Sequence, residues 1–506
     1  MQDWQTISLL ALLIVGMIAI AEIVRRFAGW SVEFTRKFVH ISVGIISVSA
    51  VSLMGDALAM ILVAGSFGLV NLFALRRGLL KSMHGTRLSY GTAFYPLAFA
   101  VLLLLCFPAN KLVIIAAMLV LSFGDAAAAI VGEGLAKVRT YILIKDSKSF
   151  EGSLAMLLVS TITLFLLLRY DPFSIGYQFS LLHSFWFGVA TAVVATVAEA
   201  LSHKGSDNLS VPFSTAIILY FFLSNDNAAN LQLTMAIVYA LLTAGFSIRF
   251  RFLTPSGATA LFLLAVPIFG FGGWKWTIPI LAFFILSSLL SKIGKARKTK
   301  QDELAEKESR RDYAQAFANG GLAGILMISY MFYANELFYF LYLAALAAAT
   351  ADTWATELGS LAKQTPYLIT NGEAVPAGTS GGVTTIGLVS SLAGSAAIAV
   401  SGIPFSSDLS SDWQLFLFVV AAGFLASLFD SLLGATVQVR YSCTICGKDT
   451  ERRTHCGKTT DYKRGWKWLN NNWVNALCTV SAVLFLLFFL LMTFIYILYT
   501  GLSLPA

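Results

Sequence analysis

The stretch that decides the fold is residues 122–153, SFGDAAAAIVGEGLAKVRTYILIKDSKSFEGS. It starts in an apolar run with one acid, Asp125, crosses a short basic loop and ends in SKSFEGS, where the next apolar run begins. A carboxylate inside a membrane-length segment is costly to bury and usually serves a function. A lysine, hydroxyls and small residues at a helix start suit an anion. We therefore expect Asp125 to hold a metal ion and the loop to bind phosphate; the alternative is a polar contact between helices beside a solvated loop. The loop candidates are Lys148, Ser149, Glu151, Gly152 and Ser153.

The composition is that of a polytopic membrane protein. Hydrophobic residues make up 57% of the 506 residues and charged residues only 12%, about half the charged share of a soluble domain. The apolar runs predict an all-α fold of about 16 transmembrane helices, several of them shorter than the roughly 20 residues of a straight span. The expected spans are residues 5–24, 38–53, 57–75, 90–107, 112–133, 152–168, 183–201, 210–223, 231–248, 256–270, 276–291, 316–333, 337–358, 382–402, 413–437 and 474–500.

The basic residues predict which loops face the cytoplasm. With both termini outside, the inside loops contain all but three of the 35 Lys and Arg residues, namely Lys111, Arg169 and Lys275. This asymmetry follows the positive-inside rule, and it explains the net charge of +8 without a nucleic-acid partner. The polar motifs then all open toward the cytoplasm. That placement favours an enzyme over a transporter, whose polar groups lie near the membrane midplane.

A basic segment precedes the opening stretch. In RKFVH, residues 36–40, Arg36 and His40 share one face at the start of a span, with Lys37 beside them. We interpret Arg36 and Lys37 as phosphate ligands, although ordinary positive-inside charge explains them equally well. His40 lies one turn inside the apolar run and is a candidate proton acceptor.

Oxygen donors follow the opening stretch. Glu199 lies near the inner end of a span, and Asp207 and Asn208 follow it in a turn. Such side chains suit a hard cation or ribose hydroxyls. A plain Asx turn before the next helix is the alternative for Asp207 and Asn208.

These segments resemble the phytol and dolichol kinase family, membrane enzymes related to CDP-diglyceride synthetases. The resemblance covers about residues 30–215 and is carried by RKFVH, GDAAAAIVGEGLAK at 124–137, SKSFEGS at 147–153 and the segment from Glu199 to Pro212. It implies CTP as phosphate donor, magnesium as cofactor and a long-chain prenol as acceptor.

The second half has its own acids in apolar runs and its own glycine-rich loop. The loop carries hydroxyl groups and enters a helix, which suits an anion, although the Walker A ending is absent and a polar linker is the alternative. The candidates are Arg311, Asp312, Gln315 and Asn319 in RDYAQAFANG; Asp352 and Glu357 in ATADTWATELGS; Gly378, Thr379, Ser380, Gly381, Gly382 and Thr384 in the loop; Asp430 in FDSLLGATVQ; and Asn472 and Asn475 in NNWVN.

This half resembles the membrane family that contains phytyl-phosphate kinase and its bacterial relatives. The matching segments run from TPSGA at 254–258 to NNWVN at 471–475. The resemblance implies phosphorylation of an isoprenoid monophosphate to the diphosphate. We therefore expect a phytol kinase-like domain at residues 1–228 and a phytyl-phosphate kinase-like domain at residues 229–506.

The two halves also show a faint internal repeat. Each half reads acid, phosphate-type loop, acid at similar spacing, which predicts two versions of one fold. The proposed counterparts are Asp125 and Asp352, Gly152 and Gly382, and Glu199 and Asp430.

A basic loop at about residues 438–472 contains a cluster of cysteines. Cys443 and Cys446 form a CxxC half-site for zinc, and His455 with Cys456 completes four ligands. The adjacent His and Cys do not have a standard finger spacing. Either a structural zinc ion or reduced cytoplasmic thiols fit this pattern.

Together the two resemblances imply a bifunctional isoprenoid alcohol kinase that draws prenol and prenyl phosphate from the bilayer, and they imply that its product supplies tocopherol, quinone or chlorophyll synthesis. The proton acceptor is His40 or Asp125, and the oligomeric state stays open. Rival functions are a cytidylyltransferase that forms a CDP-lipid, a transporter or flippase of phosphorylated lipid, and an enzyme with one active half. The magnesium candidates are Asp125, Glu199 and Asp207 in the first half and Asp352, Glu357 and Asp430 in the second.

Overall fold

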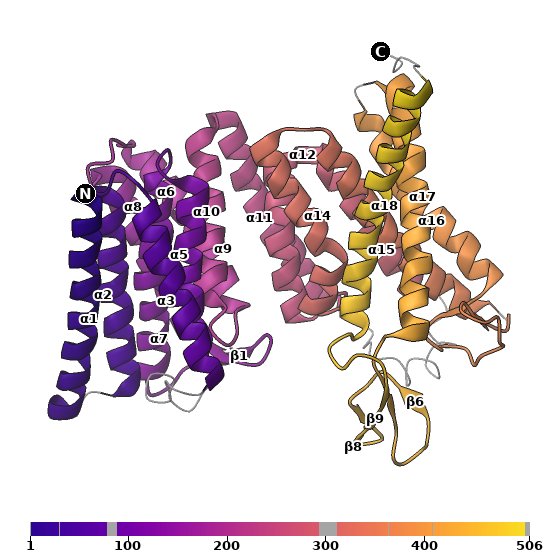
Figure 1. The fold of residues 1–506 in the computed structure, drawn as a ribbon, viewed down its shortest axis with the longest axis horizontal. Helices are drawn as coiled ribbons and strands as arrows, with labels where there is room; N and C mark the ends of the chain where they lie inside the picture. Colours follow the sequence, from indigo (N-terminus) through magenta and orange to yellow (C-terminus); the bar gives the residue numbers. More distant parts are fainter. Residues whose placement is uncertain are drawn as a thin grey trace. The chain divides into compact units, whose positions relative to one another are not determined.

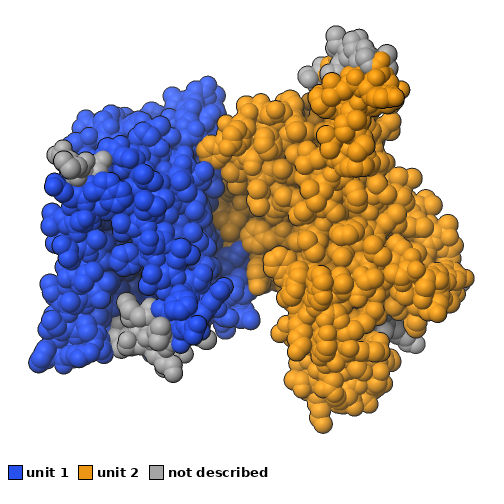
Figure 2. Space-filling model, viewed as in Figure 1, with its two compact units in different colours: residues 1–230 blue, residues 231–506 orange. Residues whose placement is uncertain are grey.

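The computed structural model describes residues 2–29, 31–77, 89–292, 311–362, 364–406 and 408–500. The chain divides into two compact units, residues 1–230 and 231–506 (Figure 2). Both units are bundles of membrane-length helices, which confirms the predicted all-α membrane fold (Figure 1).

The first unit is built around one continuous helical span that carries Asp125. This span consists of α6, the π-helical segment η1 and α7, and every residue of α6 from Leu112 to Leu119 is buried. Neighbouring helices therefore surround it. The helices of this unit are α1 (Gln2–Ala28), α2 (Val32–Leu53), α3 (Leu58–Arg77), α5 (Gly91–Cys106), α6 (Lys111–Leu119), η1 (Val120–Gly124), α7 (Asp125–Gly134), α8 (Phe150–Tyr170), α9 (Leu181–Ala200) and α10 (Asp207–Ser224).

The second unit also has a buried central helix, α15. Its residues from Tyr339 to Ala351 are all buried, and many of them are alanines that let neighbouring helices approach closely. The helices of this unit are α11 (Asn227–Arg249), α12 (Pro255–Lys292), α14 (Tyr313–Tyr333), α15 (Leu337–Leu361), α16 (Thr385–Gly402), the short η2 (Ile403–Phe405), α17 (Leu409–Thr436) and α18 (Asn471–Thr500).

Helix α12 contains two of the expected spans, joined by a turn at Gly273. The backbone of Gly273 has φ 60° and ψ −153°, a conformation that residues with a Cβ avoid. The backbone N–H of Thr254, before the first arm, donates to the carbonyl of Arg311 (3.1 Å). Ser291, at the end of the second arm, donates to Glu357, and Glu357 in turn interacts with Arg311. Both ends of α12 therefore lie beside Arg311, so the helix folds back on itself.

All the expected spans are helical in the structure. By length and hydropathy 14 helices of the described chain are able to cross a membrane, and Gly91–Cys106 is a further, shorter apolar helix. Since α12 supplies both 256–270 and 276–291, these helices account for the 16 expected segments.

Short antiparallel strands lie between the helices, and two pairs lead directly into a helix. β1 (Thr140–Ile142) pairs with β2 (Ser147–Ser149), which enters α8. β3 (Tyr367–Leu368) pairs with β4 (Gly382–Val383), which runs through Thr384 into α16. The other strands are β5 (Arg440–Ser442), β6 (Asp449–Thr450), β7 (Thr454–His455), β8 (Lys458–Thr459) and β9 (Asp461–Arg464).

Candidate functional site

Asp125 is held in the first unit by a lysine from another helix. Lys37 Nζ on α2 lies 2.6 Å from Asp125 Oδ2, and both side chains are buried. His40 Nε2 lies 3.9 Å from the same oxygen and 3.3 Å from the carbonyl of Leu121. Leu121 belongs to the π-helical segment before Asp125, a distortion that often marks functional positions in helices. The structure thus brings Lys37 and His40 next to Asp125, although Lys37 and Asp125 are 88 positions apart in the sequence.

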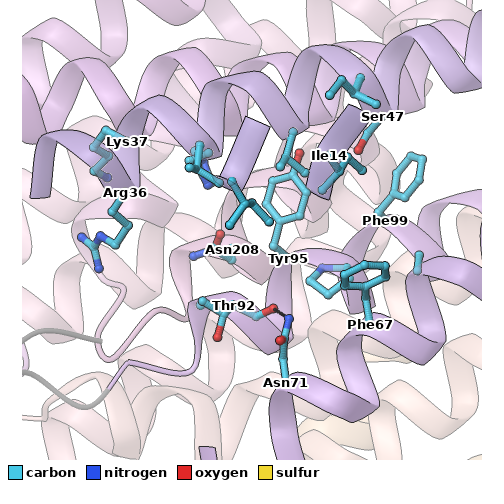
Figure 3. A pocket seen from close by; sticks show the side chains of 18 of the residues that line it. Ile14, Arg36, Lys37, Ser47, Phe67, Asn71, Thr92, Tyr95, Phe99 and Asn208 are labelled. Atoms are coloured by element: carbon cyan, nitrogen blue, oxygen red, sulfur yellow. Dashed lines mark hydrogen bonds between the residues drawn. The ribbon is translucent and has the colours of Figure 1, made fainter. Parts of the chain in front are cut away.

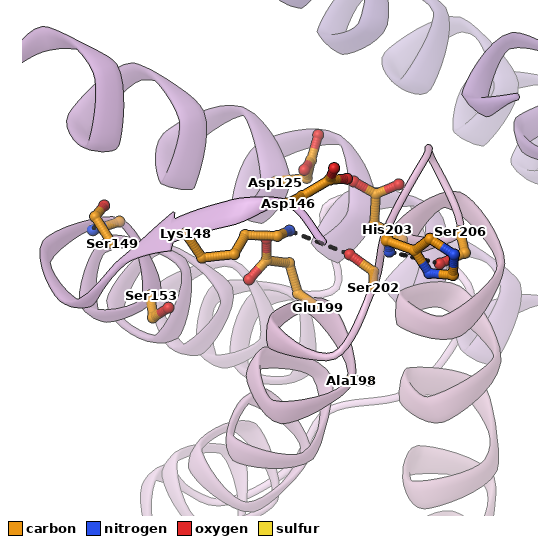
Figure 4. Close-up of polar contacts among 12 residues, drawn as sticks. Asp125, Asp146, Lys148, Ser149, Ser153, Ala198, Glu199, Ser202, His203 and Ser206 are labelled. Atoms are coloured by element: carbon orange, nitrogen blue, oxygen red, sulfur yellow. Dashed lines mark hydrogen bonds and ion pairs between the residues drawn. The ribbon is translucent and has the colours of Figure 1, made fainter. Parts of the chain in front are cut away.

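A second ion pair, between the half-buried Lys148 and the buried Glu199, joins the loop to helix α9. Lys148 forms an ion pair with Glu199 and donates a hydrogen bond to Ser202 Oγ (3.1 Å; Figure 4). Burial by itself would lower the pKa of Lys148, but the carboxylates of Glu199, Asp207 and Asp125 raise it above its ordinary value. Lys148 therefore remains a cation beside these acids at any physiological pH.

A cavity of about 940 Å³ opens beside Asp125. At one end it is polar, and at the other it is lined by apolar side chains of α1, α2, α3 and α5, including Ile14, Phe67 and Phe99 (Figure 3). Along α2 the lining runs from Lys37 to Ala50, about 20 Å at 1.5 Å per residue. This shape suits a molecule with a small polar head and a long hydrocarbon chain. The polar end is lined by Arg36, Lys37, His40, Asp125, Asp146, Lys204, Asp207 and Asn208.

Asp146 and Lys204 line the polar end but were not predicted from the sequence. Asp146 precedes β2, and its carboxylate accepts a hydrogen bond from the backbone N–H of Lys204 (2.9 Å). This bond ties the β1–β2 turn to the loop before α10. Asp207 interacts electrostatically with Asp125 and Lys148 across the same space. Asp146 directly precedes the SKSFEGS segment in the sequence, and this position could have identified it as a candidate.

The remaining loop candidates mainly shape the loop. Ser149 accepts a hydrogen bond from Gly152 N (3.1 Å) and so begins α8, a standard cap for a helix. Glu151 bonds to Arg139 (3.2 Å), and Ser153 Oγ lies 2.7 Å from Tyr141 Oη. These contacts turn the three side chains toward the loop and its hairpin.

The predicted acids of the second unit fall in two places. Asp352 on α15 and Asp430 on α17 both interact electrostatically with the buried thiol of Cys478 on α18. Glu357, one turn further along α15, accepts a hydrogen bond from Ser291 Oγ (2.6 Å). Arg311 lies over the ring of Phe283 (5.6 Å).

Burial lowers the pKa of Arg311, and Glu357 opposes this effect. Since the guanidinium keeps its charge in proteins, Arg311 is a partly buried cation beside an acid. Asp312 caps α14 by accepting from Gln315 N (3.0 Å), and Asn475 donates to Asn319 (3.4 Å).

The glycine-rich loop 378–384 is anchored at both ends. The hydroxyl of Ser380 donates to Glu451, and its carbonyl accepts from Arg440 Nη2 (2.7 Å). Gly381 has φ 82° and packs directly on Ala435, where a side chain would not fit. Thr384 caps α16 by accepting from Gly387 N (3.0 Å). The neighbouring candidates Thr379, Gly382 and Asn472 lie in this loop and at the start of α18.

The two units contain the same local arrangement of helix, hairpin and capped helix. In the first, a Cβ at Gly152 would lie 2.7 Å from the carbonyl oxygen of Ala128, three residues after Asp125. In the second, a Cβ at Gly387 would lie 3.3 Å from that of Ala355, three residues after Asp352.

The hydroxyl caps also correspond, since Ser149 and Thr384 each bond the glycine three positions later. The counterpart of Gly152 is therefore Gly387. The predicted counterpart, Gly382, is therefore wrong. That prediction rested on the spacing between the acids and the glycines, and spacing does not reveal the hydrogen-bonded cap.

The four predicted zinc ligands lie together, whereas the predicted magnesium ligands do not form such a group. In the described part of the chain, Cys443, Cys446, His455 and Cys456 are the one group of three or more potential metal ligands whose atoms all lie within 4.8 Å of one another. Asp125 and Glu199 are instead each paired with a lysine.

Comparison with known proteins agrees with this architecture. The phytol kinase of Synechocystis sp. is 34% identical over 231 residues, which cover 43% of this chain and 91% of that protein. The chain belongs to the phytol kinase-like family. Residues 238–483, within the second unit, match the family described as Integral membrane protein DUF92.

Two plant proteins are also similar. Protein PGR of Arabidopsis thaliana is 29% identical over 272 residues, which cover 49% of this chain and 93% of that protein. The chloroplastic protein VTE6 of the same plant is 25% identical over 231 residues, or 44% of this chain and 61% of that protein. No solved structure matches the chain.

Proposed function

We propose that the chain is a fused kinase that phosphorylates a long-chain prenol such as phytol in its first unit and the resulting monophosphate in its second, with CTP as phosphate donor. The observation that carries this proposal is the cavity beside Asp125, with acids and bases at one end and about 20 Å of apolar wall. The similarity to a phytol kinase supports the same substrate class.

In the first unit the prenol hydroxyl attacks the γ-phosphorus of CTP, the bond to the β-phosphate oxygen breaks, and CDP leaves. The hydrocarbon chain lies along the apolar wall and presents the hydroxyl at the polar end. Arg36, Lys37 and Lys148 neutralise the phosphate oxygens, which is the main task of a protein in phosphoryl transfer. His40 takes the hydroxyl proton at Nδ1 when its Nε2 donates to Leu121 O, and Asp125 then stabilises the imidazolium.

The donor set at the polar end fits magnesium. Asp125, Asp207 and Asn208 offer carboxylate and carbonyl oxygens around the same space, and Mg²⁺ usually takes one or two carboxylates together with phosphates and water. Bound there, it would neutralise charge on the nucleotide phosphates. Lys37 would move from Asp125 toward phosphate as the nucleotide enters.

In the second unit the acceptor is a monophosphate, whose ionised oxygen requires no base. Two anions must instead be brought together, so positive charge is required. Arg311 and the backbone of loop 378–384 would bind the phosphates, and Asp352 with Asp430 would hold magnesium. The shared arrangement around Asp125 and Asp352 supports two related active sites.

The orientation follows from charge. The Lys and Arg asymmetry supports an orientation in which both termini would lie outside and the Asp125 and Asp352 ends of the helices would lie at the cytoplasmic face. CTP would then reach both sites from the cytoplasm, and prenol would enter from the bilayer.

The experiment is incubation of the purified full-length protein with γ-labelled CTP, magnesium and prenols of different length, with identification of labelled lipids and nucleotide products. Labelled prenyl monophosphate and diphosphate with release of CDP are expected. A CDP-lipid with release of pyrophosphate would assign the chain to the cytidylyltransferases, and lipid movement in vesicles without nucleotide would assign it to the transporters.

A further inference from the structure

The segment 438–470, which we call the cysteine ribbon, has almost no hydrophobic core of its own. Its strands are two to four residues long and form two small sheets. Among its apolar side chains Val439, Cys443 and Leu469 are buried, whereas Ile445, Tyr462, Trp466 and Trp468 are more than 45% exposed. Segments this small seldom fold without a disulfide or a metal ion.

The ribbon places four ligand atoms at metal-binding distances. His455 Nδ1 lies 3.5 Å from Cys446 Sγ and 3.2 Å from Cys456 Sγ, and the four atoms lie within 4.8 Å of one another. In tetrahedral zinc sites, with Zn–S near 2.3 Å and Zn–N near 2.0 Å, sulfur and nitrogen ligands are about 3.5 Å apart. The two observed sulfur–nitrogen separations are close to that value, and all four ligand atoms lie near enough to one another to share one ion.

The backbone around these ligands matches a metal-binding turn. Ile445 N donates to Cys443 Sγ (3.4 Å), a contact that stabilises a thiolate. Cys456 has φ 50°, which turns the chain between the neighbouring residues and lets His455 and Cys456 reach one point. The four residues come from two hairpins, β5–β6 and β7–β8, so a shared ion joins them.

We infer that Cys443, Cys446, His455 and Cys456 bind one Zn²⁺, and that this ion folds the cysteine ribbon and thereby positions the loop 378–384. Three thiolates and one imidazole favour zinc over magnesium or calcium, which prefer oxygen ligands. The ion is structural, because four protein ligands leave no open position.

The ribbon contacts the loop directly at Ser380 in two places and contacts helix α17 beside the loop in a third. Glu451, directly after β6, accepts a hydrogen bond from the Ser380 hydroxyl. Arg440 of β5 donates to the Ser380 carbonyl (2.7 Å), and Arg464 of β9 donates to Ala435 O (2.7 Å), next to Gly381. Arg440 and Arg464 belong to the sheet β6–β5–β9, and Glu451 directly follows its strand β6. Loss of the fold of this sheet would therefore release the loop. The catalytic consequence, but not the metal site, rests on the proposed second phosphorylation.

The first test is metal analysis of the full-length protein in detergent. We expect about one zinc ion per chain, and near none in Cys446→Ser and Cys456→Ser. Cys106→Ser, in helix α5, is the matched control and should keep the metal. His455→Cys should also keep it, because a fourth thiolate replaces the imidazole, whereas His455→Ala should lose it. Zinc-free protein that stays zinc-free after exposure to zinc, or full occupancy in the Cys446 and Cys456 variants, would overturn the inference.

The second test separates the metal from its effect. Removal of zinc by a chelator should expose the ribbon and the 378–384 loop to limited proteolysis, while the first unit stays intact. Glu451→Ala should keep zinc but expose the loop, and it should lower formation of diphosphate more than formation of monophosphate. A loop that stays protected without zinc contradicts the positioning role. Zinc binding with protection of the loop, but no diphosphate from the native protein, would count against the proposed function alone.

Discussion

The cavity beside Asp125 predicts that chain-length selectivity can be changed at one position. Ala50 is buried on α2 and lines the apolar end, some 20 Å from Lys37. In Ala50→Phe the ring would occupy the space of about four methylene groups, each worth ~0.8 kcal/mol when buried. The loss is about 3 kcal/mol, or roughly 200-fold in kcat/KM, for a prenol that fills the cavity. A prenol with a much shorter chain should lose little.

The assay compares kcat/KM for monophosphate formation with long and short prenols. The matched control is Ile45→Phe on the same helix, because Ile45 is 46% exposed and does not line the cavity. It should leave the ratio of long to short substrate unchanged. Equal losses for both substrates in Ala50→Phe, or the same shift in Ile45→Phe, would refute this account of the cavity.

Three further predictions concern the ion pairs, the base and the shared glycine contacts. Lys37→Met leaves Asp125 as an uncompensated buried charge and should cost about 3–5 kcal/mol of stability in detergent; the double variant Lys37→Met/Asp125→Leu should regain most of it, and no recovery would contradict the pairing. His40→Ala should lower kcat of the first step by about 10²–10⁴-fold at neutral pH, and a change only in KM would argue against a proton acceptor. Gly152→Val should impair monophosphate formation alone and Gly387→Val diphosphate formation alone, with Gly134→Ala, which has open space around it, as the neutral control.

The helices were predictable because each span is a long apolar run, which the membrane permits only as helix. The turn at Gly273 was expected as a break between 256–270 and 276–291. Asp125 and Glu199 were also found, because charges in apolar segments stand out, and Lys148 was found in the polar motif that joins two such segments. The sequence thus identified the spans and most of the polar end of the cavity.

The pairing of these residues could not be predicted from the sequence. Nothing in the chain order says that Lys37 pairs with Asp125 and Lys148 with Glu199, since the first pair joins two helices and the second joins strand β2 to α9. The apolar wall of the cavity could not be predicted for another reason. Its side chains are of the same apolar types as those that face lipid, and only the packing of the helices shows which of them line the cavity. Gly387 was missed because its role depends on contact with Ala355 and on the Thr384 cap, rather than on spacing.

The most direct measurement is the product pattern of two variants in the labelled CTP assay. Asp125→Asn should form no monophosphate from prenol but should still convert added monophosphate to diphosphate. Asp352→Asn should form monophosphate and stop there. If either variant lost both steps while keeping the native melting temperature, or if neither lost a step, the assignment of one phosphorylation to each unit would be wrong.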